Sequence, residues 1–225
     1  DNIDAAVIDI GHEDLSPYKL VVVPALYLMS DAAAANIRAY VEAGGTVIMT
    51  AFSAKVGETN QWFNTPLPGG LSDVFGLRTS QFYRPPFALT GTLGGEEFTS
   101  TINFYEVLEP STASVLGRID NVDGQPPVAT VNRFGRGQAI YVATPAQPSI
   151  MAPIYRALYA ELGIVRGPNT PAGVYARVVD GRTLYVNTTG EPKDIALGAG
   201  RRGVLSDQSL NETLRLGPWG VEVVE

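Results

Sequence analysis

Two short apolar runs with a helical pattern between them constrain the fold of this chain most. Residues 19–24 (KLVVVP) and 46–50 (TVIMT) are almost wholly apolar, as expected for strands of a parallel sheet that is covered on both faces. Between them, residues 31–43 carry apolar side chains at helical spacing, and Ser30 is placed to cap the helix. Residues 5–10 (AAVIDI) predict an earlier strand. The order strand, strand, helix, strand predicts an α/β domain.

The remaining sequence predicts a change to a small β domain. In the middle we expect a short helix at 70–75, strands at 98–102, 105–108 and 114–119, two strands around a turn within 128–144, and a helix at 149–162. Residues 165–173 (VRGPNTPAG) have the composition of a linker. After them we expect six short strands, at 174–179, 183–187, 194–197, 203–205, 213–216 and 221–224. The sequence therefore predicts an α/β domain at 1–166 and a small antiparallel β domain at 167–225.

The composition argues against several classes of partner. The net charge is −7 and the 16 basic residues are scattered, which disfavours a nucleic-acid partner. No run reaches the roughly 18 apolar residues of a membrane span. The chain has no cysteine and one histidine, so we expect no metal or other cofactor. We expect a cytoplasmic protein, although a periplasmic or secreted one stays open because a chain without cysteine suits either redox compartment.

Two catalytic arrangements can be drawn from the residues that follow predicted strands. His12 with Asp9, Glu13 and Asp14 offers weak metal ligands, but the same residues suit a solvated turn. Ser53 and His12 would both lie at the carboxyl edge of the sheet, where, with Asp9 or Asp14, they would form the triad of a serine hydrolase. Ser53 stands in AFSAK, however, and not in the G-x-S-x-G turn that exposes a nucleophilic serine.

Neither a carboxylate pair nor a phosphate-binding loop follows from the sequence. Glu96 and Glu97 are neighbours, so on a strand they point to opposite faces and cannot flank one substrate bond. The glycine-rich residues 135–137 and 197–200 lie in expected β turns, whereas a nucleotide fingerprint needs a strand before it and a helix after it.

Aromatic residues in the irregular middle of the chain are the most suggestive candidates for binding. Trp62, Phe63, Phe82 and Tyr83 lie among prolines, glycines and polar residues. Such side chains on loops anchor protein interfaces or stack on sugars, but they can equally cover a sheet edge as a satellite core. The sequence leaves both interpretations open, and we take these four residues as a possible interface.

Several segments resemble the middle and C-terminal parts of glycoside hydrolase family 42 β-galactosidases. The most specific is YKLVVVPALYLMSDAAAANIRAYVEAGGTVIMT at 18–50, followed by NQWFNTPLPGGLSDVFGLR at 60–78. PPVATVNRFGRGQAIYVAT at 126–144 resembles the strand-turn-strand before the last helix of that middle domain. GVYARVVDGRTLYVNTTGEPKDIAL at 173–197 and LRLGPWGVEVVE at 214–225 are similar to the small β domain that ends those enzymes.

The resemblance implies a non-catalytic structural part of a larger enzyme. It implies a flavodoxin-like, doubly wound α/β domain, similar to class I glutamine amidotransferases, which helps to assemble a homotrimer. It also implies that the catalytic acid/base and nucleophile glutamates lie in a separate N-terminal (β/α)8 barrel, which cleaves terminal β-D-galactosides with retention. No catalytic or substrate-binding residue carries over, and TAFSA at 50–54 has no cysteine where the amidotransferases have their nucleophile.

The resemblance also predicts a strand and helix that would precede residues 5–10. We therefore expect the chain to be a fragment whose partner is the missing barrel, and which meets galactoside only through that parent enzyme. Two other interpretations stay open. One is a stand-alone carbohydrate- or protein-binding module that uses the region of Trp62, and the other is a Ser53 hydrolase.

Overall fold

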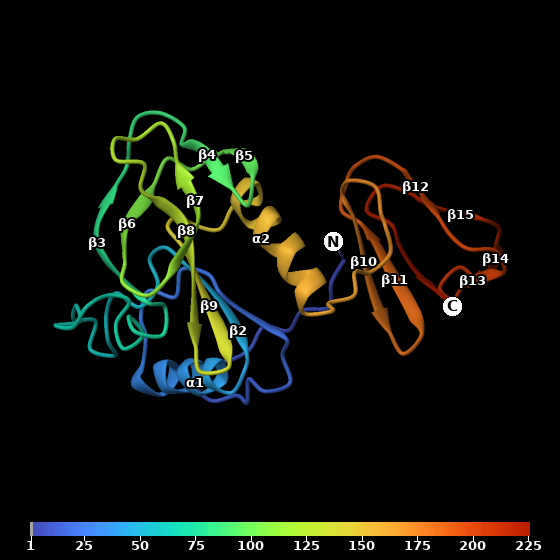
Figure 1. Cartoon of the computed structure of the whole chain (residues 1–225). Helices are drawn as coiled ribbons and strands as arrows, with labels where there is room; N and C mark the ends of the chain where they lie inside the picture. The colour runs from blue at the N-terminus through green and yellow to red at the C-terminus, as the bar shows by residue number, and fades with distance from the viewer. Residues whose placement is uncertain (1) are drawn as a thin grey trace. The chain divides into compact units, whose positions relative to one another are not determined.

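The computed structural model describes residues 2–225, which form two helices and sixteen strands. By their contacts these residues fall into two compact units, residues 8–164 and residues 2–7 together with 165–225. Figure 1 shows both units.

The unit of residues 8–164 is built on a mixed seven-stranded sheet in the order β1-β2-β9-β8-β7-β4-β5. Only the neighbours β1, β2 and β9 run parallel, and the remaining pairs are antiparallel. Two further strands form a separate antiparallel pair, β3 with β6. The strands are β1 (Leu20–Val23), β2 (Thr46–Thr50), β3 (Leu77–Tyr83), β4 (Thr90–Leu93), β5 (Glu96–Thr99), β6 (Tyr105–Pro110), β7 (Ser114–Ile119), β8 (Pro127–Phe134) and β9 (Gly137–Val142).

The prediction of a doubly wound, flavodoxin-like α/β fold is wrong. Residues 8–164 contain only the helices α1 (Asp31–Glu42) and α2 (Pro148–Glu161) beside nine strands. A doubly wound sheet needs a crossover helix between its successive parallel strands. Here a single helix joins only β1 to β2, and the chain from β3 to β9 contains no helix. The α/β spacing at the start of the chain is a local feature, and the unit as a whole is mostly β.

The helix α1 begins where the sequence predicts and ends one residue earlier, at Glu42. The side-chain oxygen of Ser30 accepts a hydrogen bond from the backbone N–H of Ala33 (3.1 Å), which caps the first turn. After the helix, Gly44 has φ +117°, a conformation that suits glycine. Gly45 lies under the ring of Tyr40, and a Cβ at Gly45 would approach that ring to 2.3 Å. The paired glycines therefore both stop the helix and let Tyr40 pack over the start of β2.

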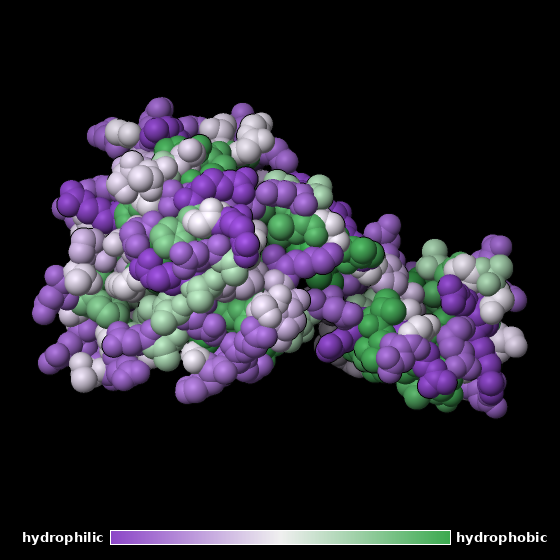
Figure 2. Space-filling model, turned by 60° about the horizontal axis from the view of Figure 1, so that its bottom comes forward, coloured by the Kyte–Doolittle hydropathy of each residue, from purple (hydrophilic) through white to green (hydrophobic). Residues whose placement is uncertain are grey.

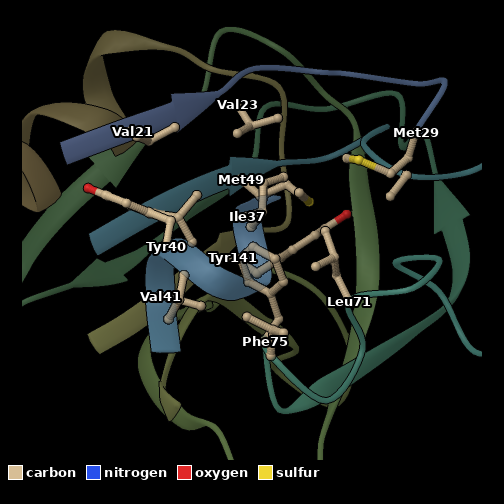
Figure 3. Close-up of a cluster of buried hydrophobic side chains, with 14 of the residues drawn as sticks. Val21, Val23, Met29, Ile37, Tyr40, Val41, Met49, Leu71, Phe75 and Tyr141 are labelled. Carbon is tan, nitrogen blue, oxygen red and sulfur yellow. The ribbon is translucent and has the colours of Figure 1, made fainter. Parts of the chain in front are cut away.

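Each face of the parallel strands carries its own hydrophobic core, because side chains alternate along a strand. Val47 and Met49 of β2 point into a cluster with α1, whereas Ile48 points into a second cluster with α2. Figure 3 shows the first cluster, in which Ile37 and Val41 of α1 face β2 and β9. The second cluster joins α2 through Ile150, Met151, Ile154 and Leu158 to β4, β8 and β9.

Two predicted elements do not form. Residues 5–10 make no strand, and Val7 is fully exposed. They have no hydrogen-bonded neighbour strand, and a strand without partners is not stable in water. β1 is the edge strand of its sheet, and the strand and helix expected to precede residue 5 stay a prediction. Residues 70–75 form consecutive turns, because so short a segment cannot offset the cost of nucleating a helix.

The second unit contains only antiparallel strand pairs. It has a five-stranded sheet in the order β10-β11-β16-β13-β14 and a two-stranded sheet of β12 and β15. The strands are β10 (Val174–Val179), β11 (Arg182–Asn187), β12 (Lys193–Ala196), β13 (Arg201–Gly203), β14 (Gln208–Leu210), β15 (Thr213–Leu216) and β16 (Val221–Val224). Residues 2–7 join this unit, since the side chain of Asn2 accepts from the backbone N–H of Ala176 (2.9 Å) and donates to the carbonyl of Pro168 (2.7 Å).

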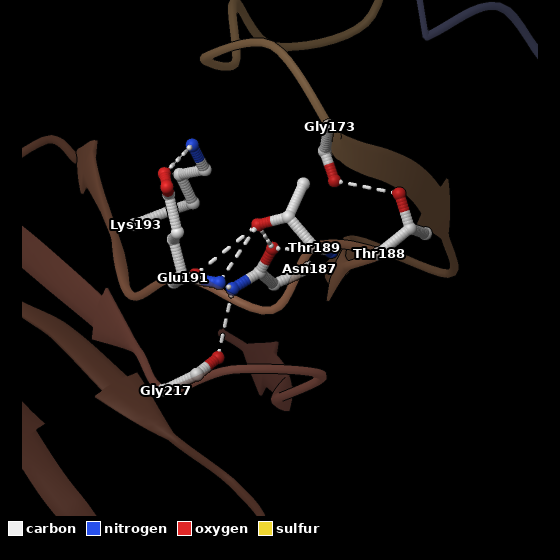
Figure 4. Close-up of polar contacts among 7 residues, drawn as sticks. All are labelled: Gly173, Asn187, Thr188, Thr189, Glu191, Lys193 and Gly217. Atoms are coloured by element: carbon white, nitrogen blue, oxygen red, sulfur yellow. Dashed lines mark hydrogen bonds and ion pairs between the residues drawn. The ribbon is translucent and has the colours of Figure 1, made fainter.

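A buried asparagine holds two loops of this unit together. The side-chain amide of Asn187 donates to the carbonyls of Glu191 (2.7 Å) and Gly217 (2.8 Å), as Figure 4 shows. Its side-chain oxygen accepts from both the backbone N–H and the hydroxyl of Thr189. The loop after β11 and the loop before β16 are thereby fixed to each other.

Neither α1 nor α2, the helices of residues 2–225, has the length and hydropathy that a bilayer-spanning helix needs.

Candidate functional site

The acidic turn after residue 8 uses its own carboxylates as hydrogen-bond acceptors. Asp9 accepts from the backbone N–H of Gly11 (3.0 Å) and lies 2.9 Å from the His12 ring nitrogen Nδ1. The Gly11 N–H, followed by His12, lowers the pKa of Asp9. Asp14 accepts from Ser16, and Glu13 accepts from the backbone N–H of Asp9. Among residues 2–225 no group of three or more acidic or histidine side chains could hold a metal ion.

Ser53 is a buried structural residue. Its side chain is fully inaccessible, its hydroxyl donates to the carbonyl of Val23 (3.4 Å), and it accepts from the backbone N–H of Leu26 (3.1 Å). His12 is exposed and pairs with Asp9 instead. A substrate cannot reach this hydroxyl, so the geometry contradicts the Ser53 hydrolase interpretation.

The other sequence candidates are also structural. Glu96 on β5 pairs with Arg156 of α2, which ties the edge of the sheet to that helix. Residues 134–137 form the turn between β8 and β9, where a Cβ at Gly137 would come within 2.3 Å of the carbonyl oxygens of Val41 and Gly45. This turn packs against the end of α1.

Trp62 is displayed by a small hydrogen-bonded hairpin. Its backbone pairs with Val56, and the N–H of Gly57 donates to the carbonyl of Gln61 (3.0 Å). Trp62 is 55% exposed, and its indole and the ring of Tyr27 form an edge-to-face pair with centroids 6.4 Å apart. The hairpin therefore fixes the backbone on both sides of the exposed indole.

A second aromatic group lies where β2 ends. The rings of Phe52 and Phe104 stack at 4.3 Å, and Phe82 stacks on Phe104 at 5.7 Å. Tyr83 lies beside Tyr105, with centroids 5.6 Å apart. Phe82 and Tyr83 of β3 are 60% and 48% exposed. Stacked rings of this kind are worth about 0.5–1.5 kcal/mol beyond their burial, so the exposed rings have a rigid support.

We name the exposed side chains of Tyr27, Trp62, Phe82 and Tyr83 the aromatic surface, within which Phe82 and Tyr83 point to opposite faces of β3. The loop of residues 51–56 supports both of its parts, because Phe52 contacts Phe82 and Val56 pairs with Trp62. Of the four predicted interface residues, Phe63 alone is half-buried and packs against the core near Gly69. On the face shown in Figure 2, apolar patches are set among hydrophilic side chains.

A buried charged cluster lies behind this loop. The ammonium of Lys55 is 2.9 Å from Oε1 of Glu106, and the two residues are 4% and 2% exposed. Lys55 also donates to the hydroxyl of Thr79 (2.9 Å), and the hydroxyl of Tyr141 donates to Oε2 of Glu106 (2.7 Å). Oε1 of Glu106 additionally accepts from the backbone N–H of Phe52 (3.0 Å).

Burial shifts the pKa values of two groups in this cluster. It lowers the pKa of Lys55, against the opposing effect of Glu106, and it raises the pKa of Tyr141 well above its ordinary value. Sequence reasoning missed Phe52, Lys55 and Glu106. The sequence signal for them is a charged residue inside each of two largely apolar segments, AFSAKV and YEVL.

The aromatic residues and the buried charged cluster all belong to the unit of residues 8–164. The family model described as the β-galactosidase trimerisation domain matches residues 1–165. The chain therefore belongs to the family of trimerisation domains found in glycoside hydrolase family 42 β-galactosidases. This assignment confirms the resemblance found in the sequence.

Similar proteins agree with this assignment. The β-galactosidase BgaP of Planococcus sp. (strain L4) is 31% identical over 226 residues, which cover 94% of this chain and 33% of that protein. The β-galactosidase BglY of Alicyclobacillus acidocaldarius is 29% identical and is matched over 95% of this chain and 33% of its own length. The crystal structure of β-galactosidase from Bacillus circulans sp. alkalophilus has a TM-score of 0.82 at 28% identity, covering 95% of this chain and 34% of that one. This chain thus spans about a third of the length of the relatives it matches.

Proposed function

We propose that this chain is the part of a β-galactosidase that joins its subunits into a homotrimer. The match of residues 1–165 to a trimerisation domain carries this proposal. The names of the relatives support the parent activity, hydrolysis of terminal β-D-galactosides, and a share of about a third of their length leaves room for a separate catalytic domain. We place the hydrolysis in a (β/α)8 barrel outside residues 1–225, with two carboxylates as in other retaining glycosidases.

The contact with a second copy is proposed to run through the aromatic surface. Trp62, Phe82 and Tyr83 are large, exposed and held in place by neighbouring rings. Side chains of this kind dominate the binding energy of interfaces when they enter desolvated pockets. A threefold ring uses two different patches on each copy, so the aromatic surface is expected to meet another part of the neighbouring subunit.

Analytical ultracentrifugation of the chain tests the proposal. We expect a species of three times the 24.0 kDa chain mass. Trp62→Ala and Phe82→Ala should each weaken the trimer by at least about tenfold, the effect of losing roughly 1.4 kcal/mol at a hot spot. Trp219→Ala is the matched control, because Trp219 is equally aromatic and 68% exposed but lies in the other unit. A monomer at all concentrations, or equal effects of the three variants, contradicts the proposal.

The size and activity of the natural gene product test the proposal that a separate barrel carries out the hydrolysis. A barrel of about 250 residues or more added to this chain gives roughly 55 kDa or above. We expect the chain alone to leave nitrophenyl β-galactoside intact, and turnover that survives purification contradicts the fragment proposal. The expected cytoplasmic location is tested by fractionating the source cells.

Carbohydrate binding at Trp62 is the second candidate function. The observation that favours it is an exposed indole on a hairpin whose tip carries Glu58, Asn60 and Gln61, side chains able to bond sugar hydroxyls. Titration of Trp219→Phe with galactosides, followed by the fluorescence of Trp62, decides this. Saturable quenching supports a binding module, and an unchanged signal at millimolar sugar removes it.

A further inference from the structure

We propose that the buried carboxylate of Glu106 is a positioning group for the aromatic surface, which it orients through the backbone of Phe52. This inference rests on the proposed function, because it assigns the residue that shapes the proposed contact. Glu106 itself is inaccessible and cannot touch a partner.

The loop that Glu106 holds has an unfavourable backbone. Phe52 and Ala54 have φ values of +66° and +52°, in the left-handed region that residues other than glycine rarely adopt. Such a conformation persists only where the surroundings over-determine it. The bond from the Phe52 N–H to Glu106 Oε1 (3.0 Å) supplies this constraint at the residue with the larger φ.

The carboxylate is itself anchored by several strands. Its second oxygen accepts from Tyr141 on β9 (2.7 Å), and its first oxygen pairs with Lys55, which in turn bonds Thr79 on β3. The backbone N–H of Glu106 donates to the carbonyl of Ala143 just after β9 (2.8 Å). The position of the carboxylate is therefore set by the core and not by the surface loop.

Through its ring, Phe52 supports Phe82, one of the exposed rings of the aromatic surface. Its ring stacks on Phe104 at 4.3 Å and contacts Phe82 at 6.3 Å. If the backbone of Phe52 relaxed to an ordinary negative φ, its side chain would leave this stack, and Phe82 would lose part of its support. Fixing the rings before binding reduces the entropy that association costs.

The stability of the unit alone does not require the buried Lys55–Glu106 pair. Replacing such a pair by apolar residues of similar volume is often neutral or stabilising. What apolar side chains cannot replace here is the acceptor for the Phe52 N–H. This difference separates a positioning role from a merely structural one.

Two double variants make the matched test. Lys55→Met with Glu106→Gln removes both charges but keeps an oxygen that can accept from Phe52 and an amide that can donate to Tyr141. Lys55→Met with Glu106→Met removes the charges and the acceptor together. We expect the Gln variant to keep the trimer dissociation constant within about threefold and the Met variant to weaken it by about tenfold or more. The Met variant should also unfold at a lower temperature, because the Phe52 N–H and the Tyr141 hydroxyl lose their acceptor.

A local measurement keeps the inference separate from the proposed function. The nuclear Overhauser effect between the rings of Phe52 and Phe104 should persist in the Gln variant and vanish in the Met variant, whatever the oligomeric state. If it persists in both, the inference is overturned even where Trp62→Ala and Phe82→Ala weaken the trimer. If those two variants have no effect, the proposed function fails while the ring contact still decides the role of Glu106.

Tyr141→Phe is a milder second variant in case the Met variant does not fold. It removes one anchor of the carboxylate and leaves the packing of the ring. We expect hydrogen exchange at the Phe52 amide to become several-fold faster, while exchange at amides in the middle of β9 stays as before. Unchanged protection at Phe52 contradicts the inference.

Discussion

Removing the side chain of Asn187 should cost the small β unit much of its stability. The side chain is buried and makes four hydrogen bonds, two as donor and two as acceptor. At about 1 kcal/mol for each bond, Asn187→Ala removes about 4 kcal/mol. The carbonyl of Gly217 keeps the Gly220 N–H as a donor, and the single proton of the Thr189 hydroxyl can turn from Asn187 to the carbonyl of Glu191, which reduces the expected loss to about 3 kcal/mol.

A loss of this size is large for so small a unit. At 0.05–0.15 kcal/mol for each residue, a unit of this kind has a total stability of only about 3–10 kcal/mol. Asn187→Ala should therefore remove about a third or more of the stability of the unit of residues 2–7 and 165–225, while residues 8–164 are unaffected.

The two tryptophans of the chain permit a selective assay, since Trp62 and Trp219 lie in different units. In a Trp62→Phe background the urea unfolding curve followed by fluorescence reports on Trp219 alone. The backbone of Trp219 donates to the carbonyl of Thr189 (3.0 Å), so it senses the loop that Asn187 holds.

Thr188→Ala is the matched control for this measurement. Its hydroxyl makes a single bond, to the carbonyl of Gly173 (2.9 Å), and the residue is exposed. The expected loss is below about 1 kcal/mol. If Asn187→Ala unfolds within about 0.5 kcal/mol of the unchanged chain, the additive use of these hydrogen bonds is refuted.

Three further predictions concern residues 8–164. Gly137→Ala should cost about 3 kcal/mol or more in chemical unfolding, because its Cβ meets the backbone carbonyl of Val41 at 2.3 Å, whereas Gly57→Ala, with only ordinary contacts at 3.7 Å, should cost less than about 1 kcal/mol. Burial raises the pKa of Tyr141, so its stabilising contribution is complete below the ordinary pKa of 10.0 and is lost as the pH rises above it. The free energy of unfolding should fall there by up to about 1.4 kcal/mol for each pH unit, and by less in Tyr141→Phe. An active-site phosphonate should not label Ser53, and mass spectrometry that finds this adduct contradicts the buried position.

Elements with strong local signals could be predicted from the sequence. The bounds of β2 and β7, the cap of α1 at Ser30 and the turn at 134–137 lie where the sequence places them. Each depends on residues close together in the chain, such as an apolar run or a glycine after a helix. The strands β3, β4 and β14 were missed, because LRTSQFY, TGTL and QSL lack an apolar run and depend on partners far away in the sequence.

Part of the candidate site could likewise be predicted from the sequence, and part of it could not. Trp62, Phe82 and Tyr83 were singled out from their composition and surroundings, and the structure places all three at the surface. Their support by Phe104 and by the Lys55–Glu106 pair could not be predicted, because Glu106 follows Lys55 by 51 positions and nothing local marks them as neighbours.

The sequence by itself determined the family and the local elements, because motifs and hydrophobic periodicity are properties of neighbouring residues. The tertiary structure decided the fold class. After β2 the chain continues through strands β3 to β9, most of which pair antiparallel, in place of the helices that a doubly wound sheet requires. It also decided that Ser53 is buried and that Phe52 is held at a positive φ by a carboxylate from another strand. Burial and long-range hydrogen bonds exist only once distant segments have packed together, so no local pattern encodes them.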